Sequence, residues 1–96
     1  MSRVHEKFAA AVRKLATGRG SIQERLVGAL REVYQAKEDE DVPIDVALEI
    51  QQFERLWNAA QQMGGEGQIE AWTRTLPDGE AVEIADWIVS AEYRLR

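Results

Sequence analysis

The sequence predicts an all-α protein, a small bundle of four main helices and one short helix. Three observations predict it. Apolar residues recur at three- and four-residue steps, only two prolines occur in the chain, and a Gly-Arg-Gly turn with a serine after it separates two such periodic segments. Ninety-six residues are enough for one domain, residues 1–96, with one modest core.

The first helix is predicted over about residues 3–17. Arg3, Lys7 and Lys14 fall within about 40° of one another on the side opposite its apolar stripe. A solvated face is the ordinary explanation of such residues, and together with Arg19 they are also candidate contacts to an anion or a partner. The apolar stripe consists of Val4, Phe8, Ala11, Val12 and Leu15.

The turn after residue 17 is expected to organise the fold. Gly18 can take the left-handed conformation that ends a helix, and Ser21 can cap the next one, with Glu24 reaching back to it. The second helix is therefore predicted over about residues 21–36, beside the first, as a hairpin or as a more open corner. Gly28 lies on its polar side, where it is either tolerated or allows close approach of a partner. The apolar face carries Ile22, Leu26, Ala29, Leu30 and Val33.

Residues 37–43 form the longest linker. Their acidic residues do not indicate a calcium-binding EF-hand loop, because the glycine and the glutamate that such a loop requires at fixed positions are missing. The third helix, about residues 44–63, is expected to contribute most to the core. The glycines of residues 64–67 end it, and they are not followed by the Gly-Lys-Ser/Thr of a phosphate-binding loop. The apolar arc of this helix consists of Val46, Ile50, Phe53, Leu56, Trp57, Ala60 and Met63.

A short helix is predicted over about residues 67–75 and the last main helix over about 78–95. Apolar side chains cover about 240° of the last helix, so it is either central to the bundle or partly covered by another chain. Trp72, Trp87 and Glu92 are the candidate interface residues. Glu92 lies inside the apolar arc, where it needs an arginine from this chain or from a second copy, unless the helix frays and the carboxylate points to water.

The titratable groups are too few to indicate an enzyme. The chain has one histidine, His5, which is an ordinary boundary residue near the N-terminus, and it has no cysteine. No serine lies in a Gly-x-Ser-x-Gly motif, and no second imidazole is present to share a metal ion. We therefore expect neither catalytic residues, nor a cofactor, nor a metal site.

The charge is divided unevenly along the chain. Residues 1–31 carry seven basic and two acidic side chains, a balance of +5, and the remaining residues carry five basic and fifteen acidic ones, a balance of −10. The first two helices could thus bind nucleic acid, and the acidic part could inhibit a basic partner. The turn at residues 17–21 could hold an anion, although such turns are usually plain connectors. No apolar run is long enough for a signal peptide or a membrane span, so a cytoplasmic protein is expected.

Residues 8–26, from Phe8 through the Gly18-Arg19-Gly20 turn to Leu26, and the run from Gly79 to Ala85 resemble a group of short, uncharacterised bacterial helical proteins. The resemblance implies a bacterial helical domain and carries over no activity. We therefore expect a non-enzymatic protein-interaction module that binds another protein or self-associates through its last helix. The alternatives are a nucleic-acid-associated regulator that uses the basic hairpin and a small acidic inhibitor.

Overall fold

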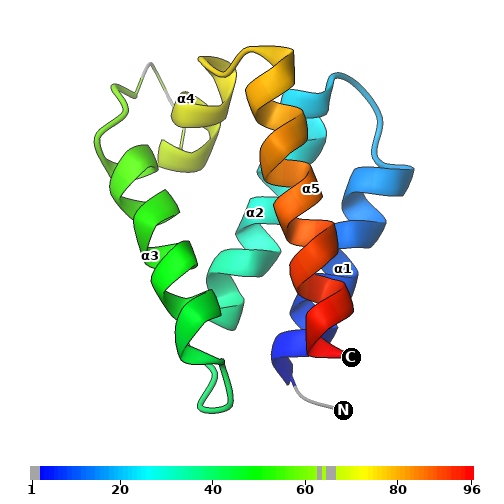
Figure 1. Cartoon of the computed structure of the whole chain (residues 1–96). Coiled ribbons are helices and arrows are strands. Elements are labelled where there is room, and N and C mark those ends of the chain that lie inside the picture. The colour runs from blue at the N-terminus through cyan, green and yellow to red at the C-terminus, as the bar shows by residue number, and fades with distance from the viewer. Residues whose placement is uncertain (1–2, 63, 65–66) are drawn as a thin grey trace.

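The all-α fold is confirmed. The computed structural model describes residues 3–62, 64 and 67–96, and within them it contains five helices and no strand. Figure 1 shows α5 between α1 and α3, with α2 behind it. The predicted bounds are close for every helix except the third. The helices are α1 (Arg3–Thr17), α2 (Ile22–Ala36), α3 (Ile44–Asn58), α4 (Gln68–Arg74) and α5 (Asp78–Leu95).

The α1–α2 connection forms a hairpin, but its glycines act differently from the prediction. Gly20, not Gly18, has the left-handed backbone, with φ of 96°. Gly18 instead provides room, because a Cβ there would lie 2.6 Å from the carbonyl oxygen of Lys14 and 2.9 Å from Cγ of Arg25. The Arg25 side chain crosses from α2 and donates from Nη1 to the Leu15 carbonyl oxygen at 2.9 Å, which caps the end of α1. Ser21 caps α2 as predicted, since its Oγ accepts from the Glu24 amide at 3.1 Å.

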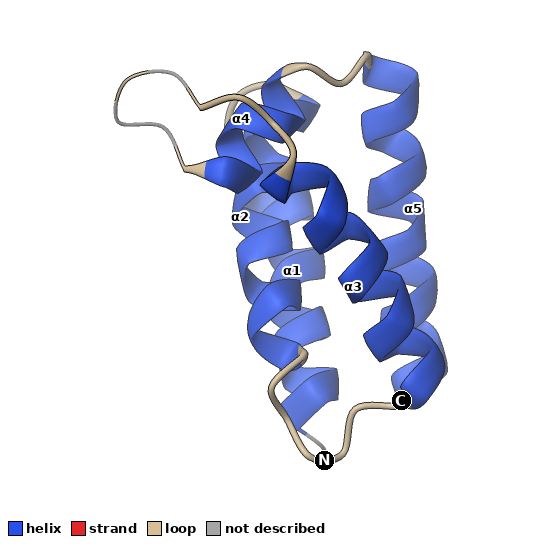
Figure 2. Ribbon diagram, turned by 90° about the vertical axis from the view of Figure 1, so that its left-hand side faces the viewer, coloured by secondary structure: helices blue, strands red, loops and turns tan. Residues whose placement is uncertain are grey.

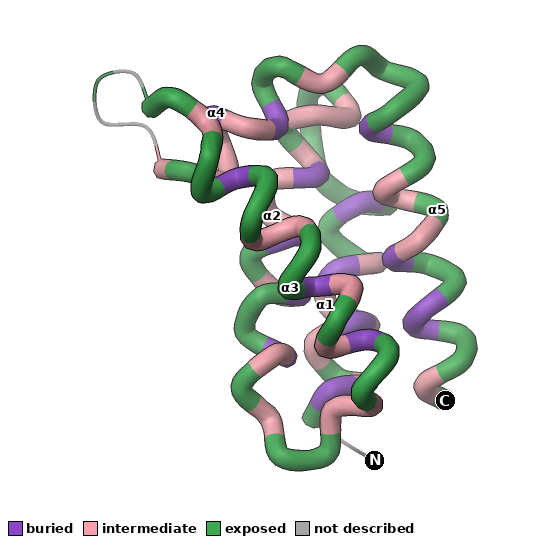
Figure 3. Tube along the Cα trace, turned by 60° about the vertical axis from the view of Figure 1, so that its left-hand side comes forward, coloured by how far each residue is buried: buried purple, intermediate pink, exposed green. Residues whose placement is uncertain are grey.

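The centre of the bundle is α2, which packs against all four other helices. Its apolar face is almost entirely buried, whereas α3 buries fewer side chains than α1 or α2. The prediction that the third helix contributes most to the core is therefore wrong. Figure 3 shows buried residues along the inner sides of α1, α2 and α5. The buried residues of α2 are Leu26, Ala29, Leu30, Val33 and Ala36, and those of α3 are Val46, Ile50 and Trp57.

The third helix ends earlier than predicted, at Asn58 rather than near residue 63. The amide of Ala60 bonds to the carbonyl of Trp57 at 3.2 Å, a tightened last turn, and the side-chain amide of Gln68 donates to the Asn58 carbonyl at 3.4 Å. These contacts satisfy the end of α3 where α4 meets it. Of the predicted apolar arc, Met63 lies outside the described residues, and Leu56 is half exposed.

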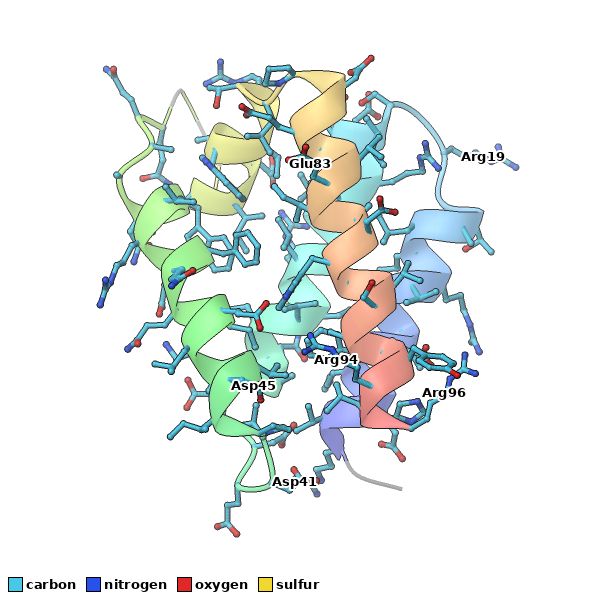
Figure 4. All side chains as sticks on the ribbon, viewed as in Figure 1. Arg19, Asp41, Asp45, Glu83, Arg94 and Arg96 are labelled. Atoms are coloured by element: carbon cyan, nitrogen blue, oxygen red, sulfur yellow. The ribbon has the colours of Figure 1, made fainter. Side chains whose placement is uncertain are left out.

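Both apolar contacts and polar side chains join α3 to α5: Ile50 and Ile88 belong to one core cluster, and the rings of Phe53 and Trp87 lie 5.0 Å apart. The Trp87 indole N–H donates to the carboxylate of Glu49, and Nη1 of Arg94 lies 3.6 Å from the Asp45 carboxylate. Figure 2 shows α3 and α5 as separate columns on the same side of the molecule, and Figure 4 labels Arg94 and Asp45 on their facing sides. On its other side α3 is held by Glu54, which accepts from Lys37 at 2.6 Å and from Tyr34 at 2.8 Å.

Candidate interaction surfaces

The outward side of α5 keeps an apolar stripe. Val82, Val89 and Tyr93 are 47%, 46% and 71% exposed, and at 100° per residue they lie within about 40° of one another. The opposite side of the helix buries Ala81, Ile88 and Ala91 in the bundle. The bundle therefore covers only part of the broad apolar arc of α5 and leaves this stripe in solvent. The seven-residue step from Val82 to Val89 is the sequence signal that could have singled these residues out.

Glu92 is buried and paired within the chain. Its side chain accepts from Arg96 Nε at 3.1 Å, and the same oxygen lies 3.1 Å from Nε2 of His5. The Arg96 guanidinium lowers the pKa of Glu92, and His5 acts in the same direction, while burial opposes both. The helix continues past this position, so the expectation of a frayed, solvated carboxylate is wrong. Because the partners come from the same chain, Glu92 does not require a second copy.

His5 was not recognised from the sequence as the partner of Glu92. The two residues are 87 positions apart, and no local pattern relates the first turn of a chain to its last. The contact arises because α1 and α5 pack side by side, and α1 begins at the same end of the bundle at which α5 ends, as Figure 1 shows. His5 is accordingly a structural partner at the α1–α5 seam.

Six aromatic rings contact one another in a continuous series through the molecule. Trp57 and Trp72 touch with ring centroids 6.2 Å apart, and Phe53 contacts both Trp72 and Trp87, at 6.1 and 5.0 Å. Trp87 and Trp72 are only partly buried, yet their rings and the Trp87 N–H make contacts within the molecule. The full order of contacts is Tyr34, Trp57, Trp72, Phe53, Trp87 and Phe8.

One edge of Trp72 borders an open groove of about 630 Å³ between the end of α3 and α4. Apolar side chains form most of its wall, and Gln61, Arg74 and Thr75 add polar groups. The volume is in the range of small-ligand pockets, but the groove is shallow. Its remaining wall residues are Leu56, Ala59 and Ala60.

The predicted basic face of α1 is largely used inside the bundle. Lys14 Nζ lies 3.0 Å from the Glu32 carboxylate, and Lys7 donates to the Gln35 side chain at 2.8 Å and lies 3.9 Å from Glu32. The structure therefore brings Lys7 and Lys14 together at α2. Gly28 lies beneath Lys14, because a Cβ there would be 3.2 Å from Cδ of Lys14. The close approach that this glycine allows is that of α1.

The other two candidate cations are exposed and separate. Arg3 begins α1, and Arg19 lies in the turn after its last residue, so the whole of the 15-residue helix, about 22 Å long, separates them. Figure 4 shows Arg19 extending away from the bundle. The structure does not gather Arg3, Lys7, Lys14 and Arg19 into one basic surface.

The described residues contain no group of three or more histidine, cysteine, aspartate or glutamate side chains that could hold a metal ion. Among the same residues, no helix is long and apolar enough to cross a bilayer.

Comparisons with known proteins found no matching family model, no matching curated protein and no matching solved structure. The resemblance to short bacterial helical proteins therefore stays a prediction.

Proposed function

We propose that this protein is a non-enzymatic interaction module and that it binds its partner through the outward side of α5. One observation carries the proposal: the stripe of Val82, Val89 and Tyr93 stays in solvent although the remainder of the apolar arc of α5 is used inside the bundle. Exposed apolar residues scattered singly are ordinary on a protein surface, whereas a stripe along one helix is a typical contact for a partner helix.

The exposed apolar residues of α3 make a poorer surface. Ile44 and Leu48 lie one turn apart at the start of α3, but Leu56, the third exposed one, is turned about 120° from Ile44 around the helix. Glutamines 51 and 52 lie between them. A partner helix that contacts all three would have to cover an arc about three times as wide as that of the α5 stripe, which favours α5.

A nucleic-acid-associated regulator has less support. Glu32 neutralises part of the charge of Lys7 and Lys14, and Arg3 and Arg19 lie at opposite ends of α1. Binding to the phosphate backbone needs several cations on one surface. The acidic-inhibitor alternative rests only on the acids of the chain, several of which take part in the ion pairs described above. A cytoplasmic location, which the proposal assumes, agrees with the lack of cysteine.

The test uses two matched charge substitutions. Val89→Glu places a carboxylate in the middle of the stripe, and Leu48→Glu places one at a similarly exposed apolar position on α3. Both variants should fold, because both sites are about half exposed. Association should be followed in purified protein by sedimentation velocity and in extracts of the native cell by affinity capture.

A complex, with itself or with another protein, that Val89→Glu abolishes and Leu48→Glu preserves is the expected result. Complexes that survive Val89→Glu unchanged would place the interaction elsewhere and overturn the assignment to α5.

A further inference from the structure

We infer that the partner of the α5 stripe is a second copy of this chain, with the two α5 helices packed antiparallel about a two-fold axis near Val89. The inference rests on the proposed function and adds the identity and orientation of the partner. Three features support it: the distribution of charge along α5, the position of the stripe along the helix, and the small residues beside it on α1.

Charge along α5 is arranged for an antiparallel copy. Asp78 and Asp86 flank the stripe in the first half of the helix and Arg96 flanks it at the end, each exposed and about 40° from the centre of the stripe, whereas Glu80 and Arg94 lie more than 100° away from it. Figure 4 shows Glu83 and the two arginines in opposite halves of the helix. An antiparallel copy places the acidic half beside the basic end, whereas a parallel copy places like charges side by side. Opposite charges at a rim favour the first orientation and disfavour the second.

One pair of residues makes this orientation specific. Asp78 and Arg96 are 18 residues apart, which is five complete helical turns, so they lie in line on the same side of the stripe. In an antiparallel pair of helices, positions on the same side of the contact face each other. With the axis at Val89, the aspartate of one copy lies about 6 Å along the helix axis from the arginine of the other at both ends of the pair, within reach of the long arginine side chain. In the single chain Asp78 accepts from Gln23 at 2.8 Å and Arg96 binds Glu92, and both residues are exposed.

The stripe itself is nearly symmetric about the proposed axis. Val82 lies seven residues before Val89 and Tyr93 lies four after it, so in the antiparallel pair Val82 of one copy comes within about 4.5 Å, measured along the axis, of Tyr93 of the other. Val89 meets its own counterpart. Such a contact satisfies the requirement of a two-fold interface, in which the same surface is used by both subunits.

The area needed for a dimer requires a contribution from α1. A specific interface buries roughly 800 Å² per partner, and one face of an 18-residue helix presents only about 270 Å², being about 27 Å long and about 10 Å wide. Next to α5, Ala9 and Ala16 lie on the same side of α1 as His5, within about 40°. These small side chains let a second copy approach both helices. The combined face is still small, so the dimer should dissociate at micromolar concentrations.

Cross-linking tests the orientation directly, because the chain contains no cysteine and every thiol is an introduced one. Val89→Cys should cross-link with itself through a short thiol-to-thiol reagent. Val82→Cys should not, because the two thiols of an antiparallel pair would be about 21 Å apart along the axis. An equal mixture of Val82→Cys and Tyr93→Cys should give a mixed product. Leu48→Cys on α3 is the control for random collision.

The outcomes separate the inference from the proposed function. Sedimentation of the purified protein should show a concentration-dependent dimer. Val89→Glu should raise the dissociation constant of this dimer at least tenfold, and Leu48→Glu should leave it unchanged. Equal self-cross-linking of Val82→Cys and Val89→Cys would indicate a parallel dimer and overturn the antiparallel arrangement. The purified protein could instead stay monomeric at millimolar concentration, while in cell extract it binds a different protein that Val89→Glu no longer binds. That pair of results would overturn the inference of a second copy and leave the proposed function intact.

Discussion

Nε2 of His5 and Oε1 of Glu92 lie 3.1 Å apart, which joins the first turn of α1 to the last turns of α5. Arg96 adds a second donor to the same carboxylate, one helical turn further on. A buried carboxylate with two donors at the α1–α5 seam makes the stability of this end of the bundle depend on the protonation of one residue.

Acid should therefore destabilise the protein partly through Glu92. Its pKa in the folded protein lies below the ordinary carboxyl value, so the unfolded chain binds the proton more tightly. The stabilisation is complete above the ordinary carboxyl pKa and is lost as pH falls through the lowered value. Glu92→Gln should unfold more easily at pH 7, by about 1 kcal/mol, and its stability should fall less between pH 5 and pH 3. Urea titrations at several pH values measure both effects. Equal pH slopes for the parent and the variant would show that Glu92 does not carry this dependence.

Arg25 should matter more to stability than Arg19, although both lie near the same turn. Arg25→Met keeps the aliphatic stem and removes the bond to the Leu15 carbonyl, which should cost about 1 to 2 kcal/mol. Arg19→Met changes an exposed side chain and should stay within about 0.5 kcal/mol of the parent. Thermal and urea denaturation of the two variants provide the comparison. A smaller loss for Arg25→Met than for Arg19→Met would contradict the capping role.

Gly28→Ala should stabilise the protein by about 0.5 kcal/mol. Alanine gains roughly 0.8 to 1 kcal/mol of helix propensity over glycine inside a helix, and among the described residues only the flexible side chain of Lys14 comes within 4 Å of the added Cβ. A Cβ at 3.2 Å from Lys14 Cδ requires a small shift of that side chain, which takes back part of the gain. Urea denaturation gives the sign of the change in the free energy of unfolding. Lys14→Ala removes the crowding, so the double variant should show the full gain when it is compared with Lys14→Ala alone. A destabilised Gly28→Ala that Lys14→Ala fails to rescue would mean that the α1–α2 backbones are too close.

Trp87→Phe should loosen α3 specifically. Phenylalanine keeps much of the ring packing against Phe8 and Phe53 but cannot donate to Glu49. Hydrogen exchange of the α3 amides should become several-fold faster, while the α1 amides should change little. Equal acceleration in both helices would show a loss of global stability instead. Glu49→Gln, which keeps an acceptor for the indole, should retain most of the protection.

The local parts of this fold could be predicted from the sequence because they depend on neighbouring residues. Periodicity placed α1, α2 and α5, and Ser21 marked the start of α2. The role of Gly18 could be predicted only in part, since it depends on the nearby carbonyl of Lys14 and also on an arginine seven residues later that crosses to the other helix. The end of α3 depends on a side chain from α4. The ion pair between Lys14 and Glu32 depends on the rotation at which α1 packs against α2. The stripe on α5 lay within the predicted arc, but only packing decides which part of an arc is buried.

The way α3 is attached also bears on how the chain folds. The α1–α2 hairpin forms through contacts close in sequence, and such contacts form within microseconds to milliseconds because little chain entropy is lost in closing them. By contrast, α3 buries only Val46, Ile50 and Trp57, and its contacts to α5, a ring contact and two polar bridges, join residues far apart in the sequence. We expect it to dock after the α1–α2–α5 core has assembled and to detach first on unfolding. Substitutions in α3 should then change the unfolding rate far more than the folding rate.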